Sequence, residues 1–242
     1  MKFFISSFLV LSFYLPIKMH AQEKSLKVVY KQTKYFDPNE FMPDMPNDYT
    51  TQMVLSIQDS VSLYQKDPDQ KEEIFTDESG FVRRMKTQRA KSMPIIFKNL
   101  DQNVMVSQQY FFDKYFLIHD TLQPIKWKIA VGEQKTILGY NCIKAWFKDS
   151  THNVVVYFTP TILNNQGPDQ YFGLPGLILE VQSADFHAIA TEVISEDEPK
   201  EILKPAKGTV MTAQAFQSMK EEKIKERKEM MMNNRRPHIM RG

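Results

Sequence analysis

The chain has 242 residues, of which 42% are hydrophobic and 12% aromatic, with 31 basic and 29 acidic side chains. The formal net charge of +2 gives little long-range attraction for nucleic acid or for an anionic membrane, so nucleic-acid binding is disfavoured. With 17 Phe, 10 Tyr and the single cysteine Cys142, the chain can build a large core but cannot form an internal disulfide. We expect the thiol of Cys142 to be buried as a small apolar side chain.

Residues 1–21 have the organisation of a secretory signal peptide. Lys2 precedes an apolar run over residues 3–15, which is shorter than the roughly 20 residues that a membrane-spanning helix needs. Ala21 supplies the small residue before a cleavage site at Ala21/Gln22. We therefore predict export to the periplasm, the outer membrane or the medium, with no transmembrane segment in the mature chain. A retained membrane anchor is the less favoured alternative.

The N-terminal half alternates in the manner of β-strands. Residues 26–35 are rich in β-branched and aromatic side chains and predict a first strand. Residues 53–57 and 61–64 alternate apolar and polar side chains on both arms of a predicted hairpin. Loops are predicted over the Pro-rich residues 36–48 and over the charged residues 66–92. The second of these is expected to be a long, solvent-exposed segment.

Short strand signals continue through the second half. They cover residues 95–97, 103–112, 114–119, 124–131, 135–147, 154–158, 177–181 and 187–193. Many short strands without βαβ alternation predict a mainly β (α+β) fold. We expect residues 22–210 to form one large curved antiparallel sheet, either a half-barrel or sandwich-like.

A C-terminal helix is predicted over residues 211–232. Thr212 is placed to cap it, and no Gly or Pro follows before residue 233. Basic and acidic side chains interleave over residues 220–229, which is typical of a solvated helix, so docking is expected only near Phe216 and Met219. The last ten residues, 233–242, predict a disordered tail.

The hexapeptide GLPGLI at residues 173–178 is the most informative segment. Pro175 fixes its own φ, and Gly176 can adopt the positive φ that a type II turn requires after proline. Gly173 permits a close backbone approach, and Gly139 predicts a second structural turn. The hexapeptide has no nucleophile or proton donor, so we interpret it as structural. A rigid apolar lip that touches a partner or ligand is the alternative.

On this hexapeptide the chain resembles the GLPGLI family of exported bacterial proteins. The resemblance covers most of the mature chain, through residues 127–129, 137–145, 154–159, 167–168 and 209–216. It implies export in a Gram-negative bacterium, with no assigned activity and no catalytic residues to transfer. The GY-x-C pattern at residues 139–142 is also similar to that of half-barrel envelope carriers that hold acyl chains, a likeness at the level of fold only.

An open curved sheet has an apolar face that a helix, a loop or a ligand must fill. The first functional hypothesis is therefore a non-enzymatic binding protein for an apolar small molecule or an envelope protein. Its predicted binding residues are Trp127, Tyr140, Trp146, Tyr157, Phe172, Leu174 and Pro175. The second hypothesis is a structural or protein-interaction module that uses the hexapeptide turn and the C-terminal helix as contact surfaces.

Two further hypotheses rest on dispersed residues. A hydrolase would need His119, His152 or His187 beside another of these, Cys142 or a carboxylate, but the chain has no HExxH or GxSxG motif. A copper-binding protein would use thioether sulfur and imidazole. The candidate residues are Met42, Met45, Met53, Met230, Met231, Met232, His238 and Met240. Since no spacing fixes a geometry, we assign no catalytic residue, metal ligand or cofactor.

Overall fold

The computed structural model describes residues 25–35, 48–70, 80, 87, 90–149, 153–197 and 200–234. Several predictions concern residues outside these ranges. They are the signal peptide, most of the two long loops, His152 and nearly all of the C-terminal tail.

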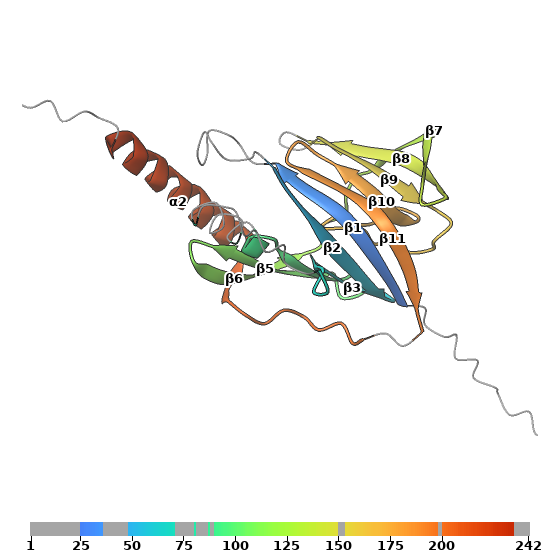
Figure 1. Ribbon diagram of the computed structural model, residues 1–242, viewed down its shortest axis with the longest axis horizontal. Helices are drawn as coiled ribbons and strands as arrows, with labels where there is room; N and C mark the ends of the chain where they lie inside the picture. Colours follow the sequence, from blue (N-terminus) through green and yellow to red (C-terminus); the bar gives the residue numbers. More distant parts are fainter. Residues whose placement is uncertain are drawn as a thin grey trace, which may run out of the picture.

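Twelve strands of the described chain form one open sheet, in the order β12-β6-β5-β4-β3-β2-β1-β11-β10-β9-β8-β7 (Figure 1). Neighbouring strands are antiparallel, except that β12 runs parallel to β6. The structure therefore confirms the mainly β fold and shows a single sheet that does not close. The strands are β1 (Ser25–Tyr35), β2 (Asp48–Gln58), β3 (Val61–Lys66), β4 (Ile95–Asn99), β5 (Val104–Phe111), β6 (Lys114–Thr121), β7 (Lys128–Ile137), β8 (Tyr140–Lys148), β9 (Asn153–Thr159), β10 (Leu177–Gln182), β11 (Phe186–Glu196) and β12 (Thr209–Thr212).

The predicted hairpin of residues 53–64 is the β2–β3 pair, and it lies near the centre of the sheet. Tyr30 of β1 pairs with Met53, and Val28 pairs with Leu55. All four side chains are fully buried on one face of the sheet. Because successive side chains of a strand point to opposite faces, this alternation fixes which face of β1 and β2 carries the core.

The sequence analysis was wrong about the boundary between β7 and β8. It predicted a strand over residues 124–131 and another over residues 135–147, whereas β7 runs continuously from Lys128 to Ile137. Leu138 and Gly139 form the two-residue turn, with φ of 51° and 81°. Positive φ at both central residues suits the twist of a hairpin. A bulge between Ala130 and Gln134 contains Gly132 and lets the strand continue through residues 132–134, which the two predicted strands had left out.

The connection from β11 to β12 crosses the β3–β6 part of the sheet. Ile202 packs there against the cluster of Phe97, Val106 and Leu117. The chain then adds β12 to the sheet edge beside β6, with Thr209 opposite Phe116. The sequence analysis placed no strand here, because four residues without a repeated alternation give no periodic signal.

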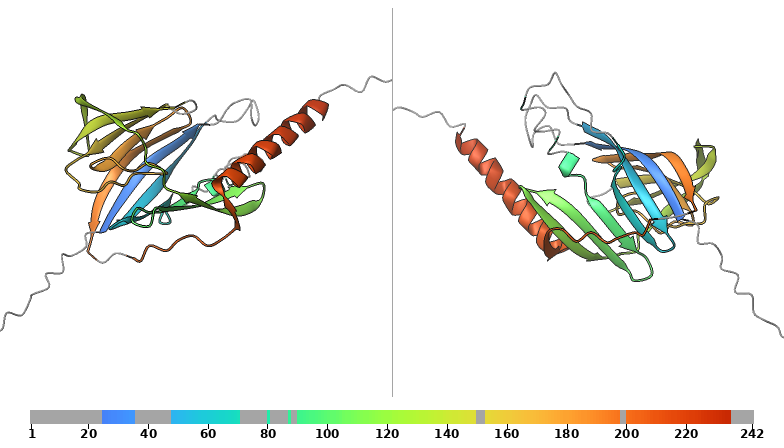
Figure 2. Two further views of the ribbon diagram at one scale, coloured as in Figure 1. Left: turned by 180° about the vertical axis from the view of Figure 1, so that it is seen from behind. Right: turned by 60° about the horizontal axis from the view of Figure 1, so that its bottom comes forward.

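The helix α2 (Ala213–Asn234) begins where the sequence predicts. The backbone N–H of Ala215 donates to Oγ1 of Thr212 at 3.2 Å, which is an N-cap bond. Phe216 packs against Phe111 and Phe116 of the neighbouring hairpin. The remainder of α2 projects away from the sheet, as the views in Figures 1 and 2 show. No helix in the described ranges has both the length and the apolar character that a membrane span requires.

The GLPGLI turn is tighter than the predicted type II turn. The backbone N–H of Gly176 donates to the carbonyl oxygen of Leu174 at 2.8 Å, which closes a three-residue turn around Pro175. The φ that proline imposes suits this geometry. The close backbone approach occurs at Gly176, which faces the carbonyl of Thr159, and not at Gly173, where a Cβ would meet open space.

This difference between the two glycines makes a testable prediction. We expect Gly176→Ala to lower the free energy of unfolding by about 3 kcal/mol, because a Cβ would collide with the Thr159 carbonyl at a φ of 154°. Gly173→Ala is the matched control, since it adds strain at a φ of 90° without a collision and should cost about 1 kcal/mol. Urea unfolding followed by tryptophan fluorescence measures both losses. Equal losses would show that the collision at Gly176 is relieved by local movement.

Candidate functional site

The two faces of the sheet differ sharply across β8, β9, β10 and β11. The pairing register aligns Ala145, Val156, Val181 and Ala188 in one row, and all four are fully buried. We call their side of the sheet the covered face. Residues one step along each strand point to the opposite side, which we call the open face.

A loop of the chain itself fills the covered face. Residues 160–176 connect β9 to β10 and place Leu174 and Tyr171 in the main core cluster, with Leu174 only 1% exposed. Trp127 closes the side of this cluster. Its Nε1 donates to the carbonyl oxygen of Phe172 at 2.8 Å, and its ring meets the Phe147 ring edge-on at 5.2 Å between centroids.

A fully buried lysine holds this loop in place. Lys98 of β4 is 0% exposed, and its Nζ donates to the backbone carbonyl oxygens of Gly167 at 2.7 Å, Asp169 at 2.7 Å and Tyr171 at 3.2 Å. An ammonium group has three donors, so three acceptors satisfy it completely. The sequence did not predict a role for Lys98, because a lysine at the end of a short apolar run gives no local sign that it is buried.

Two further buried pairs extend the polar contacts on the covered face. The Ser62 hydroxyl donates to Oε1 of Gln166 at 3.0 Å, and Nε2 of Gln166 donates to the Ser60 carbonyl oxygen at 3.0 Å. The Tyr64 hydroxyl donates to Oε1 of Gln32 at 2.7 Å. Burial holds the pKa of Tyr64 well above its ordinary value, so this hydroxyl remains a donor at neutral pH. The Gln166 bonds tie the loop to β3 and to the turn before it, and the Tyr64–Gln32 bond joins β3 to β1 beneath the loop.

Burial also changes the titration of the lysine. It lowers the pKa of Lys98 from 10.5 to about 7, and the charge of Asp169 opposes this shift. For the Asp169 carboxyl, burial raises the pKa, and the charge of Lys34 is the main opposing cause. The three hydrogen bonds of the Lys98 side chain all go to the loop. We therefore assign it a structural role.

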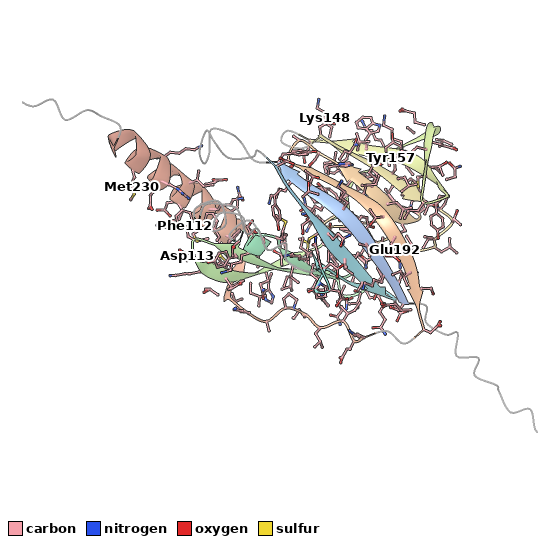
Figure 3. All side chains as sticks on the ribbon, in the orientation of Figure 1. Phe112, Asp113, Lys148, Tyr157, Glu192 and Met230 are labelled. Atoms are coloured by element: carbon pink, nitrogen blue, oxygen red, sulfur yellow. The ribbon has the colours of Figure 1, made fainter. Side chains whose placement is uncertain are left out.

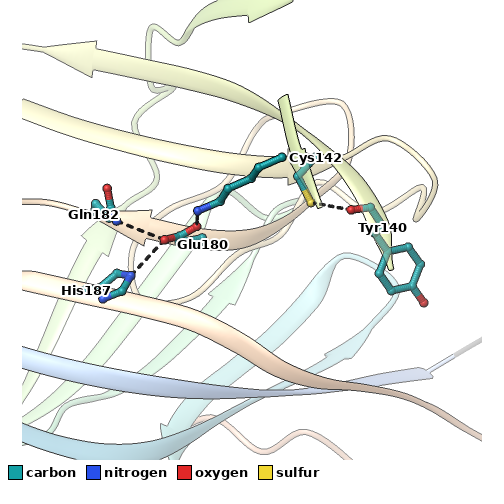
Figure 4. A network of polar contacts seen from close by, with 6 residues as sticks. Tyr140, Cys142, Glu180, Gln182 and His187 are labelled. Atoms are coloured by element: carbon teal, nitrogen blue, oxygen red, sulfur yellow. Dashed lines mark hydrogen bonds and ion pairs between the residues drawn. The ribbon is translucent and has the colours of Figure 1, made fainter. Parts of the chain in front are cut away.

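The open face carries a buried carboxylate at its centre. The Glu180 side chain is only 3% exposed, although it lies on the side away from the loop. Its Oε1 accepts from Nε2 of Gln182 at 3.1 Å and lies 3.0 Å from Nε2 of His187, and its Oε2 forms an ion pair with Lys135 (Figure 4). These three partners come from β10, β11 and β7.

Two register rows define the surface around this carboxylate. One row runs Trp146, Val155, Gln182, His187, and the next runs Lys144, Tyr157, Glu180, Ile189. We call these eight residues the central patch. A lysine ammonium group lies over each of its two aromatic rings. The Lys128 Nζ is 4.6 Å from the Trp146 ring centroid, and the Lys135 Nζ is 4.1 Å from the Tyr157 ring centroid. Figure 3 marks Tyr157 and Lys148 at the end of the molecule opposite α2.

The thiol of Cys142 is near this network but is not activated. Cys142 is fully buried, and burial raises its pKa despite opposing contributions from the backbone at Ile137 and from the Lys135 charge. Its Sγ lies 3.5 Å from the carbonyl oxygen of Tyr140, the orientation of a weak S–H donor. A nucleophile needs the thiolate, so this cysteine is suited to packing rather than to catalysis.

The seven predicted binding residues do not gather on one surface. Tyr140, Trp146 and Tyr157 belong to the open face, since Tyr140 and Trp146 lie an even number of residues from Lys144, which pairs with Tyr157. The other four belong to the covered face or the loop packed on it: Trp127, Phe172, Leu174 and Pro175. The sequence analysis also missed Glu180 and Gln182, which sat within or beside an apolar run.

The histidines are separated in the same way. His119 lies on β6 and His187 on β11, and five strands of the sheet lie between them. Of the described histidines, His187 is the one bonded to a carboxylate, through Glu180. The other groups bonded to Glu180 among the described residues belong to Lys135 and Gln182, so the bonds of this His–Glu pair include no hydroxyl or thiol nucleophile.

Comparison with known proteins adds a family and a fold. Residues 147–180 match the family described as Protein of unknown function (Porph_ging). The match includes the hexapeptide and Glu180 but covers a small part of the chain. No curated protein matches the chain significantly. Membership of the whole chain in the GLPGLI family therefore stays a prediction.

Two solved structures of PNGF-II share the fold at low identity. The form in space group P21 superimposes with a TM-score of 0.52 at 15% identity, and the form in space group C2 with 0.51 at 16% identity. Each comparison covers 81% of this chain but only 33% and 32% of the PNGF-II chains. The chain thus spans about a third of the length of these neighbours, and the likeness is one of fold alone.

The buried lysine makes a prediction about pH. Between pH 7 and 10.5 the unfolded chain keeps a proton on Lys98 that the folded chain releases, so this group's contribution to stability rises with pH across that window. The slope should approach ~1.4 kcal/mol per pH unit. We expect the ¹³Cε shift of Lys98 to titrate with a midpoint near 7. Lys98→Met assigns the signal, and a midpoint near 10 would contradict the desolvated site.

The carboxylate network makes a prediction about stability. We expect Glu180→Ala to cost about 3 kcal/mol, because it removes three contacts and leaves Lys135 without its buried partner. Glu180→Gln keeps the shape and should cost about 1 kcal/mol. Glu133→Gln is the control, since the Glu133–Lys144 pair is at the surface and should change stability by less than ~0.5 kcal/mol. Chemical unfolding measures the loss of unfolding free energy in each of the three variants. Three equal losses would contradict a stabilising role for the buried Glu180 network.

Proposed function

We propose that the protein is an exported, non-enzymatic binding protein of the cell envelope, which contacts a partner protein through the central patch on the open face. The observation that carries this proposal is the buried Glu180 carboxylate, with its three side-chain partners and the two aromatic rings beside it. Export is supported by the signal-peptide organisation of residues 1–21.

The surface around the patch has the composition of a recognition site. Trp146 and Tyr157 are half-buried on a sheet face, which leaves part of each ring accessible. At the adjoining β7 edge, Val131 is 68% exposed and Leu138 is 45% exposed. Trp and Tyr carry a disproportionate share of binding energy at protein interfaces, and clustered exposed apolar side chains mark such surfaces.

A partner protein is favoured over an apolar small molecule because of the loop. Residues 160–176 occupy the volume over the covered face that a carried ligand would need, and the polar contacts of Lys98 and Gln166 anchor them there. Releasing that loop would leave at least three buried carbonyl groups without donors, at a cost of about 1–3 kcal/mol each. The central patch requires no such opening.

The hydrolase and copper hypotheses have less support. The His187–Glu180 pair satisfies one requirement of a hydrolase, but the only cysteine is buried and its thiol is held protonated. Among the proposed copper ligands, Met53 is fully buried in the core. Four others, Met42, Met45, His238 and Met240, lie outside the described residues.

Site-specific photo-cross-linking tests the proposal. A benzophenone amino acid at Val155, which pairs with Trp146 and Gln182 at the centre of the patch, should give a discrete adduct in the envelope fraction of irradiated cells of the native host. Trp146→Ala in the same chain should reduce the yield at least fivefold, as expected for an aromatic residue at the centre of an interface.

The matched control places the same probe at Leu203, which is 65% exposed on the connection to β12 and remote from the patch. An adduct from Val155 but not from Leu203 supports the proposal, and mass spectrometry of the adduct names the partner. Equal adducts from both positions, or no envelope adduct from Val155, would overturn it. Recovery of the adduct from the cytoplasm would overturn the export part alone.

A further inference from the structure

Two side chains of the central patch share one oxygen of the buried carboxylate. Nε2 of His187 lies 3.0 Å from Oε1 of Glu180, and Nε2 of Gln182 lies 3.1 Å from the same oxygen. Gln182 and His187 are direct partners in the β10–β11 pairing, so they stand side by side on the open face. Figure 4 shows each of them turning one nitrogen toward Glu180.

The carboxylate fixes the direction of both hydrogen bonds. Glu180 is paired with the ammonium group of Lys135, and a carboxylate can only accept. The neutral ring of His187 therefore carries its proton on Nε2, which leaves Nδ1 as an acceptor. In the same way, the amide of Gln182 directs its nitrogen to Glu180 and leaves its carbonyl oxygen Oε1 as an acceptor.

Both of these acceptors are open to a partner. The His187 side chain is 31% exposed, and Gln182 is exposed. In the ranges that the structure describes, no group is hydrogen-bonded to Nδ1 of His187 or to Oε1 of Gln182. Thr33, which stands opposite His187 on β1, is bonded instead to the hydroxyl of Thr50. The central patch therefore presents two neighbouring acceptors without donors.

The charges around these acceptors are balanced. Glu180 of β10 is paired with Lys135 of β7, so the two together carry no net charge. On β1, Lys31 lies one register row away from the partner of His187. Asp185, in the turn before β11, accepts a hydrogen bond from a serine hydroxyl. A partner carboxylate has no proton to donate to the two acceptors, and a partner cation would be repelled by the two lysines. This surface is suited to neutral donors.

We infer that His187 and Gln182 select the partner of the central patch, which donates two neutral hydrogen bonds from hydroxyl or amide N–H groups, and that protonation of His187 releases it. The inference rests on the proposed function and adds the chemistry of the partner and its control by pH. Protonation places an N–H at Nδ1, so a donor of the protein then faces a donor of the partner. We expect the affinity to fall about tenfold, because an unpaired donor is left in the interface.

Nitrogen NMR of the purified protein tests the acceptors without the partner. In protein labelled with ¹⁵N-histidine, long-range proton–nitrogen spectra at about pH 8 show which ring nitrogen carries the proton. We expect the His187 proton on Nε2, protected by Glu180 from exchange with water. The ring proton of His119, which is exposed, is the control and should exchange rapidly. A neutral His187 ring with its proton on Nδ1 would overturn the inference.

The pH dependence of the cross-link tests the recognition. Envelopes isolated from cells that carry the benzophenone at Val155 are irradiated at about pH 8 and about pH 5, the range in which histidine changes charge. We expect the adduct yield to fall at least about fivefold at the lower pH. His187→Gln keeps an N–H for Glu180 and an amide oxygen but cannot gain a proton, so its yield should change less than about twofold. Gln182→Met removes one acceptor and should lower the yield about fivefold at both pH values.

The outcomes separate this inference from the proposed function. An adduct yield that is unchanged or higher in acid overturns the inference alone, and a rise would indicate a partner carboxylate on the protonated ring. A pH dependence that persists in His187→Gln also overturns it, because another group must then titrate. The absence of any adduct at both pH values overturns the proposed function and this inference with it.

Discussion

The packing of the loop from 160 to 176 on the sheet depends on one buried lysine side chain. The Lys98 side chain donates to the carbonyl oxygens of Gly167, Asp169 and Tyr171 in the loop from 160 to 176. About seventy residues of sequence separate the lysine from these partners. When the loop is held in this way, Leu174 and Tyr171 cover the apolar row of side chains on the strands. Gly176 then leads into β10 and packs closely against the carbonyl of Thr159. A side chain without a hydrogen-bond donor at position 98 would leave those carbonyls buried without partners, so the backbone requires a donor there.

An open sheet also has two edges, and both are poor templates for another strand. The β7 edge carries a bulge between Ala130 and Gln134 and the charged side chains of Lys128 and Lys135, whereas the β12 edge is only four residues long. Bulges, lysines and short strands are the usual devices that prevent edge-to-edge pairing. Strand addition by a partner is therefore disfavoured, and a partner is expected to use side chains on a face. This agrees with the position of the central patch.

Alternation predicted the strands that have one apolar face, such as β2 and β3, and composition predicted the helix from Ala213. It failed at β7, because Gly132 in a bulge and Gly139 in a tight turn look alike in sequence and only the pairing register distinguishes them. It failed for the site as well. Whether Trp127 and Trp146 share a surface depends on register and on the path of the loop, and both are long-range properties. Glu180 and Lys98 give no local signal, since a charged residue inside an apolar strand is interpreted only once its partners are known.

The two buried charges differ in what they do for the fold. Lys98 donates to three backbone carbonyl oxygens of the loop, so its burial has a structural cause. Glu180 instead binds the side chains of Lys135, Gln182 and His187, all of which lie on the open face and can reach water. Replacing such a charge network by apolar side chains of similar volume is often neutral or stabilising, so the sheet itself does not require it. The network fixes the orientation of Lys135 over the Tyr157 ring. Tyr157 and Trp146 both belong to the central patch. A preorganised aromatic and charged surface lowers the entropy cost of binding, and this is the physical reason to assign the central patch a partner rather than a role in stability.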